Sequence, residues 1–98
     1  MLQDLLRGFV RIHILYHAGQ EPVYGLWLIQ ELARHGYDLS PGTLYPILHR
    51  LEREGMLAAE KRLVGGRWRT YYRLTPTGRE MLDQVQSKLR ELTNEVLS

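Results

Sequence analysis

Basic side chains gather in one stretch of this chain, from Ser40 to Leu74. The stretch holds seven lysines and arginines against three glutamates, while the formal net charge of the whole chain is only +2. A local excess of cationic side chains is typical of a surface that binds a polyanion. Arginine can bind guanine through two hydrogen bonds, and any donor side chain can hold a phosphate. The residues that we expect to contact DNA, from a predicted helix and the two predicted strands after it, are Ser40, Thr43, Tyr45, Pro46, His49, Arg50, Arg53, Lys61, Arg62, Arg67 and Arg69.

The other reactive side chains form no catalytic pattern. The chain has no cysteine, which excludes a thiolate nucleophile, a thiolate metal site and a disulfide. Its carboxylates alternate with arginines on predicted helices, as on a solvated helix face, and it has no glycine-rich phosphate loop. His13 and His17 are four residues apart and could bind a metal ion from one helix face, but no third ligand is evident near them in the sequence. We therefore predict no enzyme activity, no metal and no cofactor.

The predicted helix SPGTLYPILHRLEREG has one face that can pack and one that can enter a DNA groove. Pro46 is awkward inside it, because proline lacks an N–H and clashes with the carbonyl four residues earlier. Either Ser40 caps the helix and Gly42 absorbs the distortion, or Thr43 is the N-cap and Pro46 lies in the first turn. We favour the second arrangement. The residues of the packing face are Leu44, Ile47, Leu48 and Leu51.

A β-hairpin is predicted around Gly65-Gly66, because two glycines suit a two-residue turn. That turn sets Val64 opposite Arg67 and Arg62 opposite Arg69. Alternation of side chains then separates an apolar face from a cationic one, and a slip by one residue would mix them. On this basis Trp68 and Tyr72 are interpreted as core residues rather than residues that stack on bases. The predicted apolar face is Leu57, Ala59, Leu63, Trp68, Tyr72 and Leu74; the opposite face is Arg62, Val64, Arg67, Arg69 and Arg73.

Three further helices are predicted around this unit, over residues 2–17, 24–35 and 76–97, with residues 18–23 as a loop. The first is apolar around most of its circumference, so its surplus face is covered either by its own small core or by a second subunit. Gly8 in this helix suggests a close backbone approach. The last helix carries apolar residues at alternating spacings of three and four, a short heptad seam. The residues that we expect at a homodimer interface are Leu5, Phe9, Leu82, Val85, Leu89, Leu92 and Val96.

The predicted fold is mainly α with a small β-hairpin: a winged helix-turn-helix over residues 1–75, followed by a dimerisation helix over residues 76–98. At 98 residues these parts form one compact unit. No apolar run reaches the roughly 18 residues that a membrane-spanning helix needs, and no signal-peptide pattern is evident. We therefore expect a cytoplasmic protein without a membrane partner.

Nearly the whole chain resembles the PadR family of transcriptional regulators. The resemblance is carried by PVYGLWLIQEL, by LSPGTLYPILHRLEREGML and by GGRWRTYYRLTPTG. It implies a homodimeric repressor that binds an inverted-repeat operator in double-stranded DNA and responds to an effector, which could be a small molecule. With a single helix after the hairpin, the chain is similar to the short branch of the family. That branch builds aromatic-lined drug sites partly on the last helix, whereas this chain has no aromatic residue after Thr75, so a ligand pocket would draw on Phe9, Tyr16 or Trp27.

Two other functions use the same fold. A winged helix can be a protein–protein interaction module that does not bind DNA, in which case the hairpin need not be cationic. A ligand-binding dimer with only vestigial DNA affinity is the third hypothesis. The clustered charge favours DNA.

Overall fold

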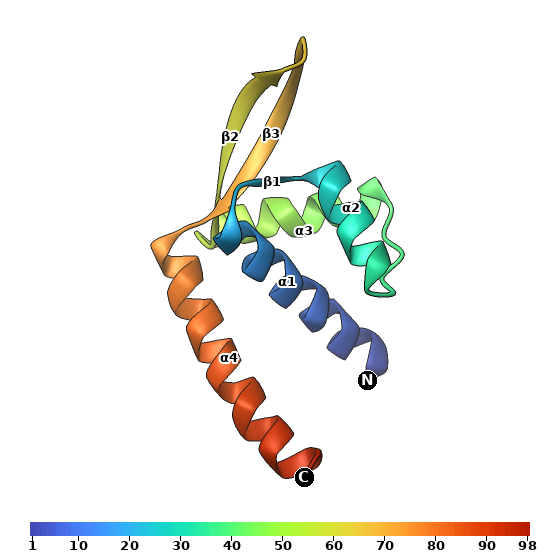
Figure 1. Ribbon diagram of the computed structural model, residues 1–98, viewed down its shortest axis with the longest axis vertical. Helices are drawn as coiled ribbons and strands as arrows, with labels where there is room; N and C mark the ends of the chain where they lie inside the picture. The colour runs from blue at the N-terminus through green and yellow to red at the C-terminus, as the bar shows by residue number, and fades with distance from the viewer.

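The computed structural model describes residues 1–98 as a mainly helical molecule with a small sheet. It measures 51 × 28 × 20 Å, and the hairpin of β2 and β3 projects from the end opposite the two termini (Figure 1). No helix is both long and apolar enough to cross a membrane. The predicted fold class is confirmed. In chain order the elements are α1 (Leu2–Gln20), β1 (Val23–Tyr24), α2 (Gly25–Arg34), α3 (Pro41–Arg53), β2 (Leu57–Val64), β3 (Arg67–Leu74) and α4 (Pro76–Val96).

The sheet is antiparallel with the strand order β1-β3-β2. The predicted hairpin register is confirmed, with Val64 opposite Arg67 across the glycine turn. Gly65 and Gly66 have φ angles of 56° and 79°, a region that suits glycine and the tight turn of a two-residue hairpin. The two-residue strand β1 was missed, because residues 18–23 read as a loop. It pairs with β3 and brings the start of α2 to the base of the hairpin.

A single hydrophobic core lies between the helices and the base of the hairpin. Side chains from α1, α2 and α3 meet there, because each of these helices carries apolar residues three or four positions apart. Tyr72 reaches the core from β3 and Leu82 from the first turns of α4. The core residues are Val10, Ile14, Leu15, Ala18, Val23, Leu28, Leu32, Leu44, Leu48, Leu51, Leu57, Tyr72 and Leu82.

The start of α3 differs from the favoured prediction. Ser40, not Thr43, is the N-cap: its Oγ accepts a hydrogen bond from the Thr43 N–H at 3.2 Å, and Pro41 occupies the first helical position. Proline suits that position because its fixed φ is already helical and an N–H is not needed there. Pro46 therefore lies inside the helix, opposite the carbonyl of exposed Gly42.

The outer part of the hairpin also differs from prediction. Trp68 is 69% exposed and Leu63 is 59% exposed, so interpreting Trp68 as a core residue was wrong. Tyr72 and Leu57 of the same face are buried, as expected. The cause is the length of the hairpin, since only its base is covered by helices (Figure 1). Alternation assigns a side chain to a face, but burial also requires something to lie against that face.

The hairpin leads directly into α4 through a tightly held junction. The Thr75 hydroxyl accepts a hydrogen bond from the Gly78 N–H at 3.0 Å and donates to the carbonyls of Met56 and Gly55. From this junction α4 runs beside the C-terminal part of α1, and the two helices then diverge (Figure 1). Gly8 has no atom within 4 Å of where a Cβ would lie, so the close approach suggested by this glycine does not occur within the chain.

Candidate nucleic-acid interface

The outer face of α3 carries all seven of its predicted DNA-contacting residues. Leu44, Leu48 and Leu51 are buried and hold the opposite face of the helix in the core. This amphipathic arrangement leaves the polar side chains free to enter a groove. The exposed residues are Ser40, Thr43, Tyr45, Pro46, His49, Arg50 and Arg53.

The two arginines of this face differ in their partners. Arg50 pairs with Glu54 at 3.2 Å, one turn further along the chain, whereas Arg53 forms no ion pair. An exposed pair of this kind contributes only about 0 to 1 kcal/mol to stability, so a phosphate can replace the glutamate. Both guanidinium groups are therefore available to a polyanion.

The hairpin, which we call the wing, carries cations over aromatic rings. The guanidinium of Arg69 lies over the ring of Tyr24, 4.3 Å from its centroid, and that of Arg62 lies 4.9 Å from the centroid of Tyr71. The two tyrosine rings meet edge to face at 5.4 Å. A cation over an aromatic face is stabilised by about 0.5 to 1 kcal/mol at an exposed site. These contacts orient two of the four candidate wing cations.

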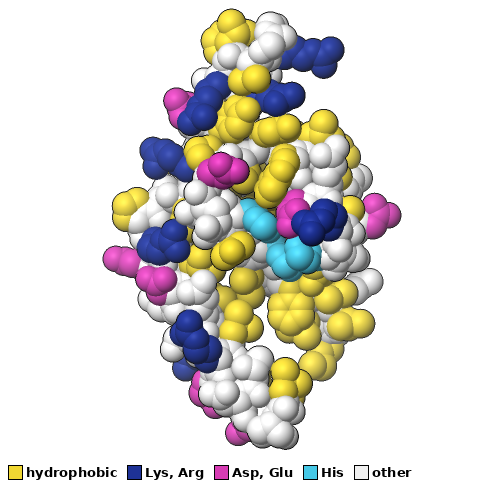
Figure 2. Space-filling view, in the orientation of Figure 1, with side chains coloured by type: hydrophobic (Ala, Val, Ile, Leu, Met, Phe, Trp, Pro, Cys, Tyr) yellow, Lys and Arg dark blue, Asp and Glu magenta, His cyan; other side chains and the backbone are white.

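The remaining wing candidates, Lys61 and Arg67, are exposed and form no ion pair. Arg62, in addition to its contact with Tyr71, pairs with Glu60 at 3.1 Å. Lys and Arg side chains gather over the wing in Figure 2. Sequence reasoning missed Tyr24 and Tyr71. The second could have been found, because it alternates onto the cationic face in the predicted register, but the first depends on the unpredicted strand β1.

A groove of about 360 Å³ joins α3 to the wing. Tyr45 of α3 lines it together with Arg67, Trp68 and Arg69 of the wing. Candidate residues from both elements therefore border one continuous surface. Tyr24 of β1 and Gly25 and Leu26 of α2 also line this groove.

A second surface, at the opposite end of the molecule, is apolar. Leu5 of α1 is 43% exposed, while Leu92 and Val96 of α4 are 50% and 63% exposed. Of the other residues that we expect at a dimer interface, Phe9, Val85 and Leu89 are half-buried and Leu82 is buried in the core of its own chain. A second subunit therefore cannot contact much of Leu82. Hydrophobic side chains lie along both diverging helices in Figure 2.

A third feature is a cavity of about 640 Å³ between α1, α2 and α4. Of the three aromatic residues named for a possible ligand pocket, Phe9 and Tyr16 line this cavity, whereas Trp27 does not and instead packs edge-on against His17. His13 and His17 of α1 also line this cavity.

His35, which directly follows α2, also lines this cavity. The expectation that His13 and His17 have no third histidine or carboxylate near them was therefore wrong. The sequence gives no local signal for this contact, because His35 lies 18 positions after His17. Burial and the neighbouring histidines lower the pKa of His13, and burial lowers the pKa of His17 despite the opposing carboxylate of Glu31. Hydrogen bonding to Arg34 lowers the pKa of Glu31.

Comparison with known proteins agrees with this architecture. The Transcriptional regulator PadR-like family matches residues 14–84. The chain is 54% identical over 96 residues to Transcriptional regulator Rv3488 of Mycobacterium tuberculosis, with 98% of this chain and 90% of the relative covered. The crystal structure of a PadR-like transcriptional regulator from Bacillus cereus superposes with a TM-score of 0.86 at 32% identity, covering 95% of this chain and 92% of the other.

A PadR family regulator from Eggerthella lenta superposes with a TM-score of 0.83 at 38% identity, covering 98% of this chain and 85% of the other. The family and these relatives are transcriptional regulators rather than enzymes. The resemblance carried by the three sequence motifs is confirmed. The chain belongs to the PadR-like family of transcriptional regulators.

Proposed function

We propose that this regulator is a homodimeric repressor that binds an inverted-repeat operator in double-stranded DNA. In each subunit α3 enters the major groove and the wing holds the adjoining phosphates or the narrower minor groove. The observation that carries the proposal is the groove in which Tyr45 of α3 lies beside Arg67 and Arg69 of the wing. A single DNA duplex can contact both elements only because they border one surface.

The apolar surface of α1 and α4 supplies the second half of the proposal. Apolar side chains that are half exposed along two diverging helices would be buried by a second copy of this chain, which gains stability in proportion to the area removed from water. Residues 76–98 then act as the dimerisation helix and residues 1–75 as the DNA-binding domain. In the dimer there are two copies of α3, the recognition helix, and each contacts one of the two operator half-sites. The interface residues proposed are Leu5, Phe9, Val85, Leu89, Leu92 and Val96.

The effector that the family resemblance implies has a candidate site in the cavity between α1, α2 and α4, which lies beside the proposed dimer interface. Leu89 lines both the cavity and the apolar groove of α4. A small molecule bound there would alter the packing between subunits, and through it the spacing of the two recognition helices.

The direct test is fluorescence anisotropy on the promoter upstream of the regulator's own gene, compared with random DNA over a range of salt concentrations. Each neutralised phosphate steepens the dependence of log affinity on log salt by about 0.9. We expect the double substitution Arg67→Ala with Arg69→Ala to weaken binding and to reduce this slope by about one for each phosphate that is no longer neutralised. Arg7→Ala with Arg90→Ala is the matched control, because it removes the same charge from the other end of the molecule.

Equal affinity for operator and random DNA would contradict the proposal. If instead the wing variant regulated its target normally, the protein–protein interaction module would be the better assignment. Thermal stabilisation by a ligand without any retarded DNA would favour the ligand-binding dimer.

A further inference from the structure

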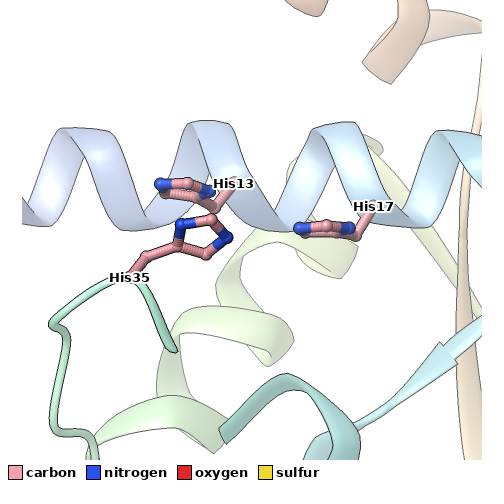
Figure 3. Close-up of side chains that lie close together, drawn as sticks. All are labelled: His13, His17 and His35. Atoms are coloured by element: carbon pink, nitrogen blue, oxygen red, sulfur yellow. The ribbon is translucent and has the colours of Figure 1, made fainter. Parts of the chain in front are cut away.

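Three of the four histidines in the chain meet inside the cavity between α1 and α2. His13 and His17 lie one turn apart on the same face of α1, and His35 rises toward them from the C-cap of α2 (Figure 3). One ring nitrogen from each histidine lies within 4.8 Å of the other two. We propose that these three imidazoles bind a divalent transition-metal ion of the zinc class.

The distances are close to those of a formed site. In a tetrahedral zinc site with Zn–N bonds of about 2.0 to 2.1 Å, ligand nitrogens lie roughly 3.4 Å apart, so the nitrogens of the cluster need to approach one another by at most about 1.4 Å. The rings of His13 and His35 are stacked with centroids 4.6 Å apart, so metal binding requires the exposed His35 ring to rotate until its nitrogen points to the ion.

The ligand set also defines which ions fit. Neutral imidazole suits zinc, nickel, cobalt and copper, whereas magnesium and calcium prefer oxygen ligands. Three protein ligands leave a fourth position for water or another donor. Because the cavity is about 640 Å³, it has room for that donor.

Glu31 acts as a positioning residue for this site. Its Oε2 lies 3.0 Å from Nε2 of His35 and 3.4 Å from Nε2 of His17. A carboxylate that accepts a hydrogen bond from a ligating histidine fixes the ring and leaves its other nitrogen for the metal. Arg34 in turn holds the second oxygen of Glu31 at 2.5 Å.

The burial of His13 and His17 agrees with metal binding. Metal binding requires neutral histidine, so a protonated cluster would have to release protons first. Burial is the largest cause that lowers the pKa of His13 and of His17, which disfavours their protonated forms.

A metal ion at this site ties α1 to the end of α2. Such a bridge stabilises the folded chain, because the unfolded chain does not hold the three histidines together. The proposal does not depend on DNA binding, and it can be tested on the free protein.

The test is calorimetric titration of Zn²⁺ into untagged, chelator-treated protein. We expect one ion per chain and a rise in Tm with added Zn²⁺. His35→Ala should weaken binding about 100-fold, as should His13→Ala. His35→Ala is the primary variant, because the side chain is exposed and its loss leaves the core intact. His49→Ala is the matched control, because it removes the one histidine outside the cluster and should leave zinc affinity unchanged.

Two results would overturn the proposal: no binding of Zn²⁺, Ni²⁺ or Co²⁺ by the wild-type protein, or unchanged affinity in both cluster variants. The role of Glu31 is tested with Co²⁺, whose visible spectrum reports coordination geometry. Glu31→Gln should retain the spectrum of a three-histidine site while lowering affinity about 10- to 100-fold. Glu54→Gln, an exposed carboxylate paired with Arg50, is the matched control.

Discussion

Tyr45 of α3 lies directly over Gly25, the first residue of α2. A Cβ at residue 25 would lie 2.3 Å from the tyrosine hydroxyl oxygen and 2.6 Å from Cζ. The absence of a side chain at Gly25 therefore permits the position of Tyr45 between the helices and the wing. The position of one residue of the proposed DNA interface therefore depends on a glycine of another helix.

The first prediction follows from this contact. Gly25→Ala should force Tyr45 out of its site and destabilise the chain by about 1 to 3 kcal/mol, as over-packing usually does. In a Tyr45→Ala background the same substitution should be neutral or stabilising, since alanine is the better helix former. Urea unfolding of the four proteins gives the coupling energy. A coupling near zero would mean that Tyr45 moves aside without cost.

A second prediction concerns Gly78, at the junction between the wing and α4. A Cβ there would lie 2.2 Å from the carbonyl oxygen of Met56, a backbone atom in a hydrogen-bonded turn that cannot move aside easily. We expect Gly78→Ala to lower the free energy of unfolding by about 2 to 3 kcal/mol.

The control for this junction is Gly42→Ala, since the nearest atom to a Cβ at residue 42 is Ser40 Oγ at 3.8 Å. Gly42 lies in a helix in open surroundings, so alanine should raise stability, by up to about 1 kcal/mol. Thermal unfolding of both variants checks the pair. If the two substitutions had similar effects, the packing at Gly78 would be looser than described.

The hairpin shows what local sequence can predict. Gly65-Gly66 determines the turn, the turn determines the register, and the register assigns every side chain of β2 and β3 to a face. Burial is different, because it depends on which elements cover the face. The helices leave Trp68 largely exposed, and nothing in its own neighbourhood in the sequence indicates this.

Two of the missed contacts join segments that are distant in the sequence. His35 joins His13 and His17 because α2 ends beside the middle of α1, and Tyr24 receives Arg69 because β1 pairs with β3. Periodicity identifies helices but does not give their relative placement. The cationic surface was predictable because its residues lie close together in the sequence.

The third prediction concerns pH and the cluster of His13 and His17. Burial lowers the pKa of both groups below the ordinary value of 6.5 in the folded chain. Below pH 6.5 the unfolded chain therefore binds more protons than the folded one, so the free energy of unfolding falls as pH decreases through that value. Of the groups that face them from α2, His35 and Arg34 act in the same direction and Glu31 opposes.

Glu31 adds to this loss at lower pH. Its pKa is lowered from 4.5 chiefly by the hydrogen bond from Arg34, so its contribution is present above 4.5 and disappears as pH falls through the folded-state pKa. Urea unfolding in the presence of a chelator, between about pH 7.5 and about pH 5.5, isolates the histidines. His13→Gln with His17→Gln should flatten the dependence, while His49→Gln, on the exposed face of α3, should not. A wild-type stability that stayed constant over this range would contradict the prediction.

The last prediction concerns the proposed dimer. Leu92 is half exposed on α4, so Leu92→Asp leaves the core of its own chain intact while placing a charge in the interface between subunits. A buried charge without a partner costs several kcal/mol, which is enough to separate the subunits. Sedimentation velocity should therefore show a folded monomer, with the helical content of each chain retained.

Leu63→Asp is the control for this substitution, because it introduces the same charge at an exposed leucine of the wing. That variant should sediment as the wild-type dimer does. The pair separates a specific interface from general charge repulsion between chains. A Leu92→Asp protein that remained a folded dimer would show that the diverging ends of α1 and α4 are not where two copies meet, and the wing and α3 of two subunits would then be arranged in some other way.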